Sequence, residues 1–298
     1  MPKIQLPWRY RSLTNFLNEH TNFVFRHVLK TPAIECNPNA GVDYVSLICH
    51  RDIHIFLLAC KSFLRFYRDV SVVAHSDGTL TRSDIQVLQR QIPGIQIVRR
   101  LEADERVSNE IESDLLKAIR ERDVSFIKLI DVNLFSTKRR IVVDSDILFL
   151  RPPTEIIDWI ESDNNRAFHH VNLDANNRFR EHLESFNKAL NTNISSLDYC
   201  SGFIGYPSSL PFSDIDQVIS VLRRIGEGWG LEQCAYAFLL MDRSDKLSER
   251  RYLAVMKNPT EKDARDAIMI HFVGKLRHYK YYTLGMKVIT ELRTPTDQ

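Results

Sequence analysis

Two carboxylates follow an apolar segment near the middle of the chain. Asp144 and Asp146 come directly after the β-branched run 141–143, which is typical of a buried strand that surfaces at its end. Acids two positions apart project to the same side of an extended backbone. Bringing both into a cleft is costly unless a cation lies between them, and hard oxygen ligands suit Mg²⁺ or Mn²⁺. The pattern predicts a divalent-metal site that holds a substrate phosphate, with a solvated turn as the alternative.

Other chemically competent side chains also stand at predicted strand ends. Cys49 and His50 follow a predicted strand, and His271 ends another apolar segment. Because open α/β sheets bind ligands outside the carboxyl ends of their strands, we expect the Cys49 end and the acidic end to face one crevice. His169 and His170 are adjacent in a predicted strand and point to opposite faces, so we interpret them as structural.

Alternating strands and helices must position these residues. In the first half, the hydrophobic pattern predicts strands at 43–49, 69–75, 95–98 and in the segment leading into Asp144, with helices at 54–67, 81–91, 110–122 and 125–136. In the second half it predicts strands at 167–171, 199–207 and 267–271, with helices within 172–190 and at 214–225 and 231–241. This alternation predicts βαβ units and an α/β fold with a mainly parallel sheet.

The chain divides into three predicted parts. Residues 1–41 form an N-terminal helical appendage, residues 42–282 a single catalytic domain, and residues 283–298 a C-terminal tail. Within the domain, residues 42–150 are the expected nucleotide-binding half and residues 151–282 the sugar and acceptor half. The appendage mixes phenylalanines with basic residues, so it either caps the domain or contacts a membrane surface as a peripheral helix.

Composition limits the classes of function. The 298 residues are 44% hydrophobic with a formal net charge of +2, which does not indicate a nucleic-acid-binding surface. No apolar run is long enough for a membrane span, and the first residues lack the apolar core of a secretory signal. Five scattered cysteines without a paired motif favour reduced thiols and a cytoplasmic location.

Several ordered motifs resemble a known enzyme family. Lys128 precedes Asp144 by sixteen positions, and the later segments are Ser201-Gly202-Phe203, Gly230-Leu231-Glu232-Gln233 and His271 through Arg277. Together with the first strand and the acidic pair, these segments resemble GT-A-fold glycosyltransferases, in particular glycosyltransferase family 8, which includes glycogenin and bacterial lipopolysaccharide galactosyltransferases. The resemblance covers roughly residues 43–281.

The resemblance implies roles for individual residues. Asp144, Asp146 and His271 would bind Mn²⁺ or Mg²⁺, and Glu232 and Gln233 would act at the reacting face of the sugar. The residues expected to bind the nucleotide-sugar are Cys49, His50, Lys128, Ser145, Ser201, Gly202, Gly274, Lys275 and Arg277. Two positions depart from the family pattern: Cys200 replaces an asparagine, and Arg277 replaces a lysine.

The resemblance also implies an activity. We expect a metal-dependent, retaining transfer of a hexose from a nucleotide-sugar, a UDP-sugar, to a saccharide, a lipid-linked glycan or a protein. Three alternatives remain: a non-catalytic nucleotide-sugar or glycan-binding relative, a haloacid-dehalogenase-like phosphotransferase and a nucleotidyltransferase. The phosphotransferase places its acidic motif on the first strand, and the nucleotidyltransferase carries a glycine-rich loop near that strand, neither of which is seen here.

Overall fold

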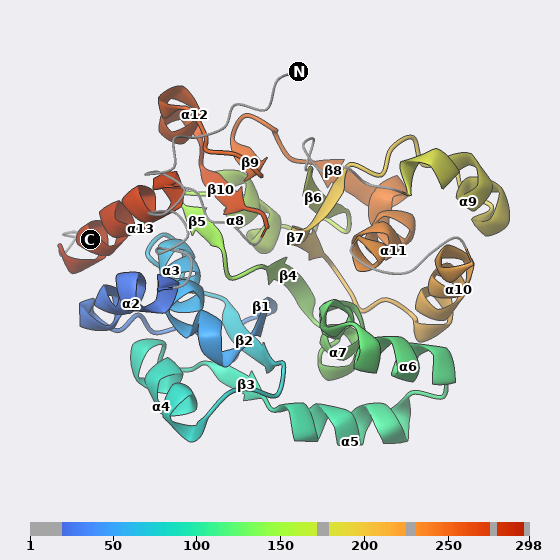
Figure 1. Ribbon diagram of the computed structural model, residues 1–298, viewed down its shortest axis with the longest axis horizontal. Helices are drawn as coiled ribbons and strands as arrows, with labels where there is room; N and C mark the ends of the chain where they lie inside the picture. Colours follow the sequence, from blue (N-terminus) through green and yellow to red (C-terminus); the bar gives the residue numbers. More distant parts are fainter. Residues whose placement is uncertain (1–19, 172–178, 225–229, 275–278, 295–298) are drawn as a thin grey trace.

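A mainly parallel sheet forms the centre of the protein (Figure 1). The computed structural model describes residues 20–171, 179–224, 230–274 and 279–294. Within these ranges the large sheet has seven strands in the order β3-β2-β1-β4-β7-β6-β8. Their bounds are β1 (Val42–Ile48), β2 (Ser71–Ser76), β3 (Gln96–Val98), β4 (Arg139–Val143), β6 (Ala167–Val171), β7 (Tyr199–Tyr206) and β8 (Ser244–Lys246). Strand β7 runs antiparallel to both β4 and β6, whereas the other neighbours are parallel.

A smaller sheet lies beside the large one. Its described strands are ordered β5-β10-β9, with bounds β5 (Ile147–Phe149), β10 (Met269–Phe272) and β9 (Tyr252–Val255). Strand β5 follows β4 after only three residues, and it pairs antiparallel with β10. The chain therefore passes from one sheet to the other through residues 144–146.

Helices cover both faces of the large sheet (Figure 1). The first half contains α2 (Thr21–Phe25), α3 (Ile53–Leu64), α4 (Arg82–Gln91), α5 (Arg100–Glu110), α6 (Asp114–Arg122) and α7 (Ile127–Phe135). The second half contains α8 (Thr154–Glu161), α9 (Leu183–Leu190), α10 (Phe212–Arg223), α11 (Leu231–Leu240), α12 (Glu261–Asp266) and α13 (Tyr279–Arg293). Short 3₁₀ helices are η1 (Arg26–Lys30), η2 (His50–Asp52), η3 (Val124–Phe126), η4 (Arg180–His182) and η5 (Met241–Arg243).

Alternation along the strands creates two apolar cores. In β1, Tyr44 belongs to the core that includes α3 and α13, whereas its neighbour Val45 belongs to the core that includes α7, α10 and α11. The same alternation is seen at Ile141 and Val142 of β4. Because both faces are covered, successive residues in the middle of these strands are apolar instead of alternating with polar ones.

The two ends of the described chain meet on α3 (Figure 1). Phe25 of α2 is fully buried, and its ring lies 5.1 Å from that of Tyr281 and 5.5 Å from that of Tyr282 in α13. Residues 20–30 therefore belong to the packed structure, and the predicted tail boundary at residue 282 falls inside α13. No helix in the described ranges has the length and apolarity needed to cross a bilayer.

Several elements differ from the sequence prediction. Residues 100–110, for which no element was predicted, form α5, whose buried side chains are only Ala103 and Val107. Strands β5, β8 and β9 contain three or four residues each and were not predicted as separate strands, because partners distant in the sequence determine them. The prediction of a mainly parallel α/β sheet is confirmed.

Candidate functional site

The carboxyl ends of two parallel strands lie at one edge of the large sheet. Strands β1 and β4 are neighbours, with Val45 paired to Val142, and they lead into Cys49 and Asp144 respectively. The Ser46 hydroxyl donates a 2.6 Å hydrogen bond to the carbonyl of Val143 just before both strands end. This is the edge at which an α/β sheet binds its ligands.

The two acids lie at a turn that connects the two sheets. An extended backbone was expected here, but Ser145 and Asp146 form a turn because β4 and β5 belong to different sheets. The amide of Asp144 donates to the Gly202 carbonyl at 2.8 Å, and the amide of Phe272 donates to the Asp146 carbonyl at 3.1 Å. One acid is thus held against β7 and the other against β10.

His271 lies next to this turn. In the β5–β10 ladder it is paired with Ile147, and its Nε2 lies 3.1 Å from Asp146 Oδ1 and 3.7 Å from Asp144 Oδ2. Burial disfavours the imidazolium, but the neighbouring Asp146 carboxylate and Cys200 together raise the pKa of His271 well above its ordinary value. Three side chains from two distant segments therefore offer donor atoms within 4.8 Å of one another.

This donor set fits a hard divalent cation. Two carboxylates and one imidazole are ligands that Mn²⁺ accepts and that Mg²⁺ tolerates. Gly202 leaves space for them, because a Cβ there would lie 2.1 Å from His271 Cε1 and 2.9 Å from Asp144 Oδ2. The absence of a side chain at residue 202 therefore allows the acid and the imidazole to approach the same point.

A buried ammonium links the acidic turn to the predicted catalytic residues. Lys128 Nζ lies 3.0 Å from Asp144 Oδ1 and 3.6 Å from Glu232 Oε1, and the Ser201 hydroxyl donates to Glu232 Oε2 at 2.8 Å. Burial opposes the charge on Lys128, but Asp144 and Glu232 outweigh it and raise its pKa. Burial raises the pKa of Glu232 to about 7, although Lys128 lowers it. Lys128 and Asp144 thus form the closer ion pair, and Glu232 titrates near neutral pH.

Helix α7 is fixed in place on both sides of Lys128. Arg120 of α6 binds both carboxylate oxygens of Asp131 at 2.6 and 2.7 Å, and both side chains are buried. The Tyr236 hydroxyl of α11 donates to the Lys128 carbonyl at 2.7 Å. A bidentate guanidinium pair restrains orientation as well as distance, so α6, α7 and α11 present Lys128 and Glu232 as one unit.

The residues predicted to contact the nucleotide lie farther along the same edge. Burial and the nearby Asp52 carboxylate raise the pKa of the half-buried Cys49 thiol to about 11, so it stays protonated. The His50 side chain is 61% exposed, and its Nδ1 lies 2.8 Å from Asp84 Oδ2. An imidazole this exposed can turn toward a ligand at low cost.

Some of the remaining predicted residues lie within the described ranges and others do not. Ser145 is half-buried within the acidic turn, and Gln233 is half-buried next to Glu232 on α11. Gly274 is exposed beyond β10 with φ of 102°, a conformation that favours glycine. Lys275 and Arg277 lie outside the described residues.

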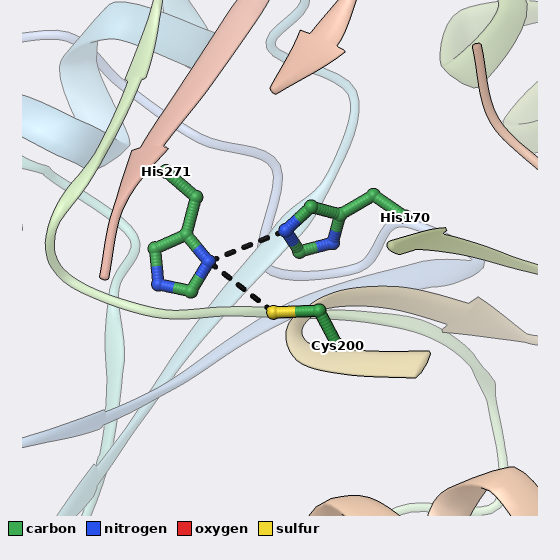
Figure 2. A group of neighbouring side chains, drawn as sticks. All are labelled: His170, Cys200 and His271. Carbon is green, nitrogen blue, oxygen red and sulfur yellow. Dashed lines mark hydrogen bonds between the residues drawn. The ribbon is translucent and has the colours of Figure 1, made fainter. Parts of the chain in front are cut away.

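Two residues near the site were not predicted as functional. His170 of β6 and Cys200 of β7 both approach Nδ1 of His271, the ring nitrogen that faces away from the acids (Figure 2). Burial raises the pKa of the Cys200 thiol, but His170 and His271 outweigh it and lower the pKa to about 5. The neighbouring His169 instead stacks on Tyr199 and contacts Ser244. The two histidines do point apart, but only one of them is remote from the site.

Comparison with known proteins identifies the fold. No protein-family model matches this sequence, and no curated protein does. The fold resembles that of the bifunctional glycosyltransferase WbbM, with a TM-score of 0.55 and 14% identity over 85% of this chain and 51% of WbbM. The chain thus spans about half the length of WbbM.

Two smaller glycosyltransferases match along nearly their whole length. The galactosyltransferase LgtC, solved with donor and acceptor sugar analogues, has a TM-score of 0.54 and 12% identity, covering 86% of this chain and 98% of LgtC. Mouse xyloside xylosyltransferase 1 has a TM-score of 0.52 and 9% identity, covering 80% of this chain and 97% of that enzyme. At such identities the likeness establishes the fold, and this chain has the GT-A fold of glycosyltransferases.

Proposed function

We propose that this protein is a metal-dependent glycosyltransferase. It would move a hexose from a UDP-sugar to a saccharide, a lipid-linked glycan or a protein, with retention of anomeric configuration. The observation that carries the proposal is the meeting of Asp144, Asp146 and His271 at the carboxyl edge of a GT-A sheet. The likeness to LgtC, which was solved with donor and acceptor sugar analogues, supports sugar transfer from a donor to an acceptor.

The three clustered metal-binding side chains would stabilise the diphosphate leaving group. A divalent ion bound by Asp144, Asp146 and His271 would neutralise the charge that develops on the diphosphate as the glycosidic bond breaks. His271 and Asp146 are almost fully buried, so they hold their positions without solvent competition. Gly274, Lys275 and Arg277 follow β10, where backbone amides and cations would contact the same phosphates.

Glu232 and Gln233 would face the sugar. Ser201 and Lys128 hold the Glu232 carboxylate, so its oxygens are oriented before substrate arrives. With a pKa of about 7, Glu232 can accept a hydrogen bond from a sugar hydroxyl or donate one to it near neutral pH. Cys49 and His50, at the end of β1, would contact the nucleoside, and Ser145 and Gly202 would line the diphosphate side.

Donor hydrolysis tests the proposal without a known acceptor. The intact chain is incubated with a panel of nucleotide-sugars, with Mn²⁺ or after chelation, and release of free sugar is measured. We expect Mn²⁺-dependent hydrolysis of a UDP-hexose, and a loss of at least about 100-fold in Asp146→Asn, which removes one charge but preserves shape. Binding of Mn²⁺ by calorimetry should weaken in the same variant.

A matched control separates the site from general effects of charge. Asp245→Asn removes a carboxylate from an exposed ion pair with Arg166 and should leave hydrolysis and Mn²⁺ binding unchanged. Full activity after chelation, or in Asp146→Asn, would rule out the proposed metal site. Phosphate release from a simple phosphomonoester would instead favour a phosphotransferase.

A further inference from the structure

A second cluster of metal-binding side chains lies behind the acidic one. His170 of β6, Cys200 of β7 and His271 of β10 converge from three strands, and each is at most 3% exposed (Figure 2). His271 belongs to both clusters: its Nε2 faces Asp144 and Asp146, and its Nδ1 faces the other two side chains. The proposed transferase reaction uses neither His170 nor Cys200.

The distances in this second cluster match those around a tetrahedral ion. His170 Nε2 lies 3.2 Å and Cys200 Sγ 3.5 Å from His271 Nδ1. With metal–nitrogen bonds of about 2.0–2.1 Å and a metal–sulfur bond of about 2.3 Å, a tetrahedron has edges of roughly 3.3 Å between nitrogens and roughly 3.6 Å between nitrogen and sulfur. Two of the three donor–donor distances therefore match those around a tetrahedral ion, and all three donor atoms lie within 4.8 Å of one another.

The orientation of His170 also suits a ligand. Its Nδ1 lies 3.0 Å from the Phe203 carbonyl, which can only accept, so Nδ1 carries the proton. In the neutral ring Nε2 then has a lone pair, and this lone pair points toward His271 Nδ1 (Figure 2). A ligating histidine that donates its other N–H to a backbone carbonyl is the usual arrangement in metal sites.

The donor types select the ion. One sulfur and two imidazole nitrogens favour Zn²⁺ or another thiophilic ion, whereas carboxylate sites favour Mn²⁺ and Mg²⁺. Three protein ligands leave the fourth tetrahedral position to a water molecule or another exogenous ligand. The acidic turn and the buried cluster thus differ in the class of metal that they accept.

We propose that His170, Cys200 and His271 form a binding site for Zn²⁺ that competes with the hard-metal site through the shared imidazole. Zn²⁺ binds the Cys200 sulfur as a thiolate and displaces the proton from Nδ1 of His271. The imidazole proton then resides on Nε2, where it donates to Asp146 at 3.1 Å and leaves no lone pair for Mn²⁺. Each ion therefore weakens the binding of the other, and this antagonism is reciprocal.

Direct metal binding to the intact chain tests the site. Zn²⁺ is titrated by competition with a chromophoric chelator, and Co²⁺ is used as a probe whose thiolate charge-transfer band reports a metal–sulfur bond. We expect one equivalent of tight Zn²⁺ and a thiolate band with Co²⁺. Both should be lost in Cys200→Ser, and Zn²⁺ affinity should fall by at least about tenfold in His170→Gln.

The control thiol is Cys36, which is also buried and donates to the Pro93 carbonyl, a bond that serine can keep. Cys36→Ser should bind both probe ions as the unmodified chain does. If the unmodified chain shows no thiolate band, or if Cys200→Ser retains it, the site is refuted. The thiolate band of the unmodified chain is measured without any variant. A folding defect in Cys200→Ser therefore cannot affect that part of the test.

The antagonism has its own test. A saturating concentration of Mn²⁺ should weaken Zn²⁺ binding by about tenfold or more in the unmodified chain and have no effect in Asp146→Asn, which lacks the hard-metal site. Equal Zn²⁺ affinity with and without Mn²⁺ would refute the coupling. These experiments use metals alone, so their outcome is separate from that of sugar transfer.

Discussion

The ammonium of Lys128 lies between two carboxylates of unequal burial. Asp144 has a side chain that is 31% exposed, whereas that of Glu232 is 7% exposed. Removing a partner from a buried ionic group costs about 3 kcal/mol, because the remaining charge stays desolvated. Lys128→Met should therefore destabilise the metal-free protein by roughly that amount, and addition of Glu232→Gln should restore at least about 1 kcal/mol. Urea unfolding of the two single variants and the double variant measures the coupling.

The pH dependence of this effect has a definite sign. Without Lys128, the already raised pKa of Glu232 rises further above its unfolded value, so the native state binds the extra proton. Stability of Lys128→Met should thus fall as pH rises from about 4.5 through neutral pH, and level off once the native carboxyl has lost that proton. Arg166→Met, which breaks an exposed pair with Asp245, should change stability by less than about 0.5 kcal/mol at every pH. Additive effects of the two buried substitutions would contradict the network.

At the residue scale, the sequence predicted which three side chains meet at the acidic turn, but not the side chains around them. Asp144, Asp146 and His271 could be selected because each follows an apolar run and carries a metal-competent group. The contacts of His170 and Cys200 with His271 could not be predicted, because they depend on a register shift in the β6–β7 ladder between His169 and His170. Nothing local in the sequence indicates that irregularity.

Strand β7 carries two glycines with different roles. A Cβ on Gly202 would lie 2.1 Å from His271 Cε1, whereas one on Gly205 would lie 2.1 Å from Phe168 Cε1 in the apolar core. Gly202→Ala should therefore push His271 out of line with Asp144 and weaken Mn²⁺ binding and donor hydrolysis by at least about tenfold. Calorimetric titration of Mn²⁺ and the hydrolysis assay check this outcome.

The matched substitution Gly205→Ala controls for strain in the same strand. It should destabilise folding by about 1–3 kcal/mol through overpacking against Phe168, while the folded fraction keeps its Mn²⁺ affinity. If both alanine variants lose Mn²⁺ binding to the same extent, the position of Gly202 beside His271 has no special role.

At the element scale, the sequence predicts correctly those helices and strands whose type is set by the local hydrophobic pattern. Strands β1, β2 and β4 and helix α3 each contain an apolar run, so their types and approximate bounds follow from the sequence. Strand β5 contains only Ile147, Leu148 and Phe149, and its separate identity depends on pairing with β10, more than a hundred residues later. The turn that places both acids beside His271 arises from that non-local pairing.

The whole molecule is built on a sheet with an apolar core on each face. Both cores depend on packed helices: α2 and α13 cover α3 on one face, and α10 and α11 complete the other. Lys128 and Glu232 belong to helices of the second face, whereas His271 comes from the smaller sheet. The candidate site is therefore assembled only when all of these layers are packed, which makes global stability a condition for metal binding.

Acid stability should reflect a histidine buried within this assembly. His75 of β2 is 2% exposed, and burial, with Arg120 and Arg140 nearby, lowers its pKa to about 3. Between about pH 6.5 and 3 the unfolded chain binds a proton at this residue that the native chain does not, so stability falls as pH falls, by up to about 1.4 kcal/mol per unit. His75→Phe should reduce this slope.

The Phe ring has room, because His75 and Phe135 line a cavity of about 230 Å³. Urea unfolding at pH 7 and pH 4.5 should show a loss smaller by roughly 2–3 kcal/mol in His75→Phe than in the unmodified chain. Some acid sensitivity should remain, because burial also lowers the pKa of His169, to about 4. The exposed His182 supplies the control, since His182→Gln should leave the slope unchanged. Equal slopes in His75→Phe and the unmodified chain would show that the native protein accepts a proton at His75, and that the packing around β2 opens in acid before the molecule unfolds.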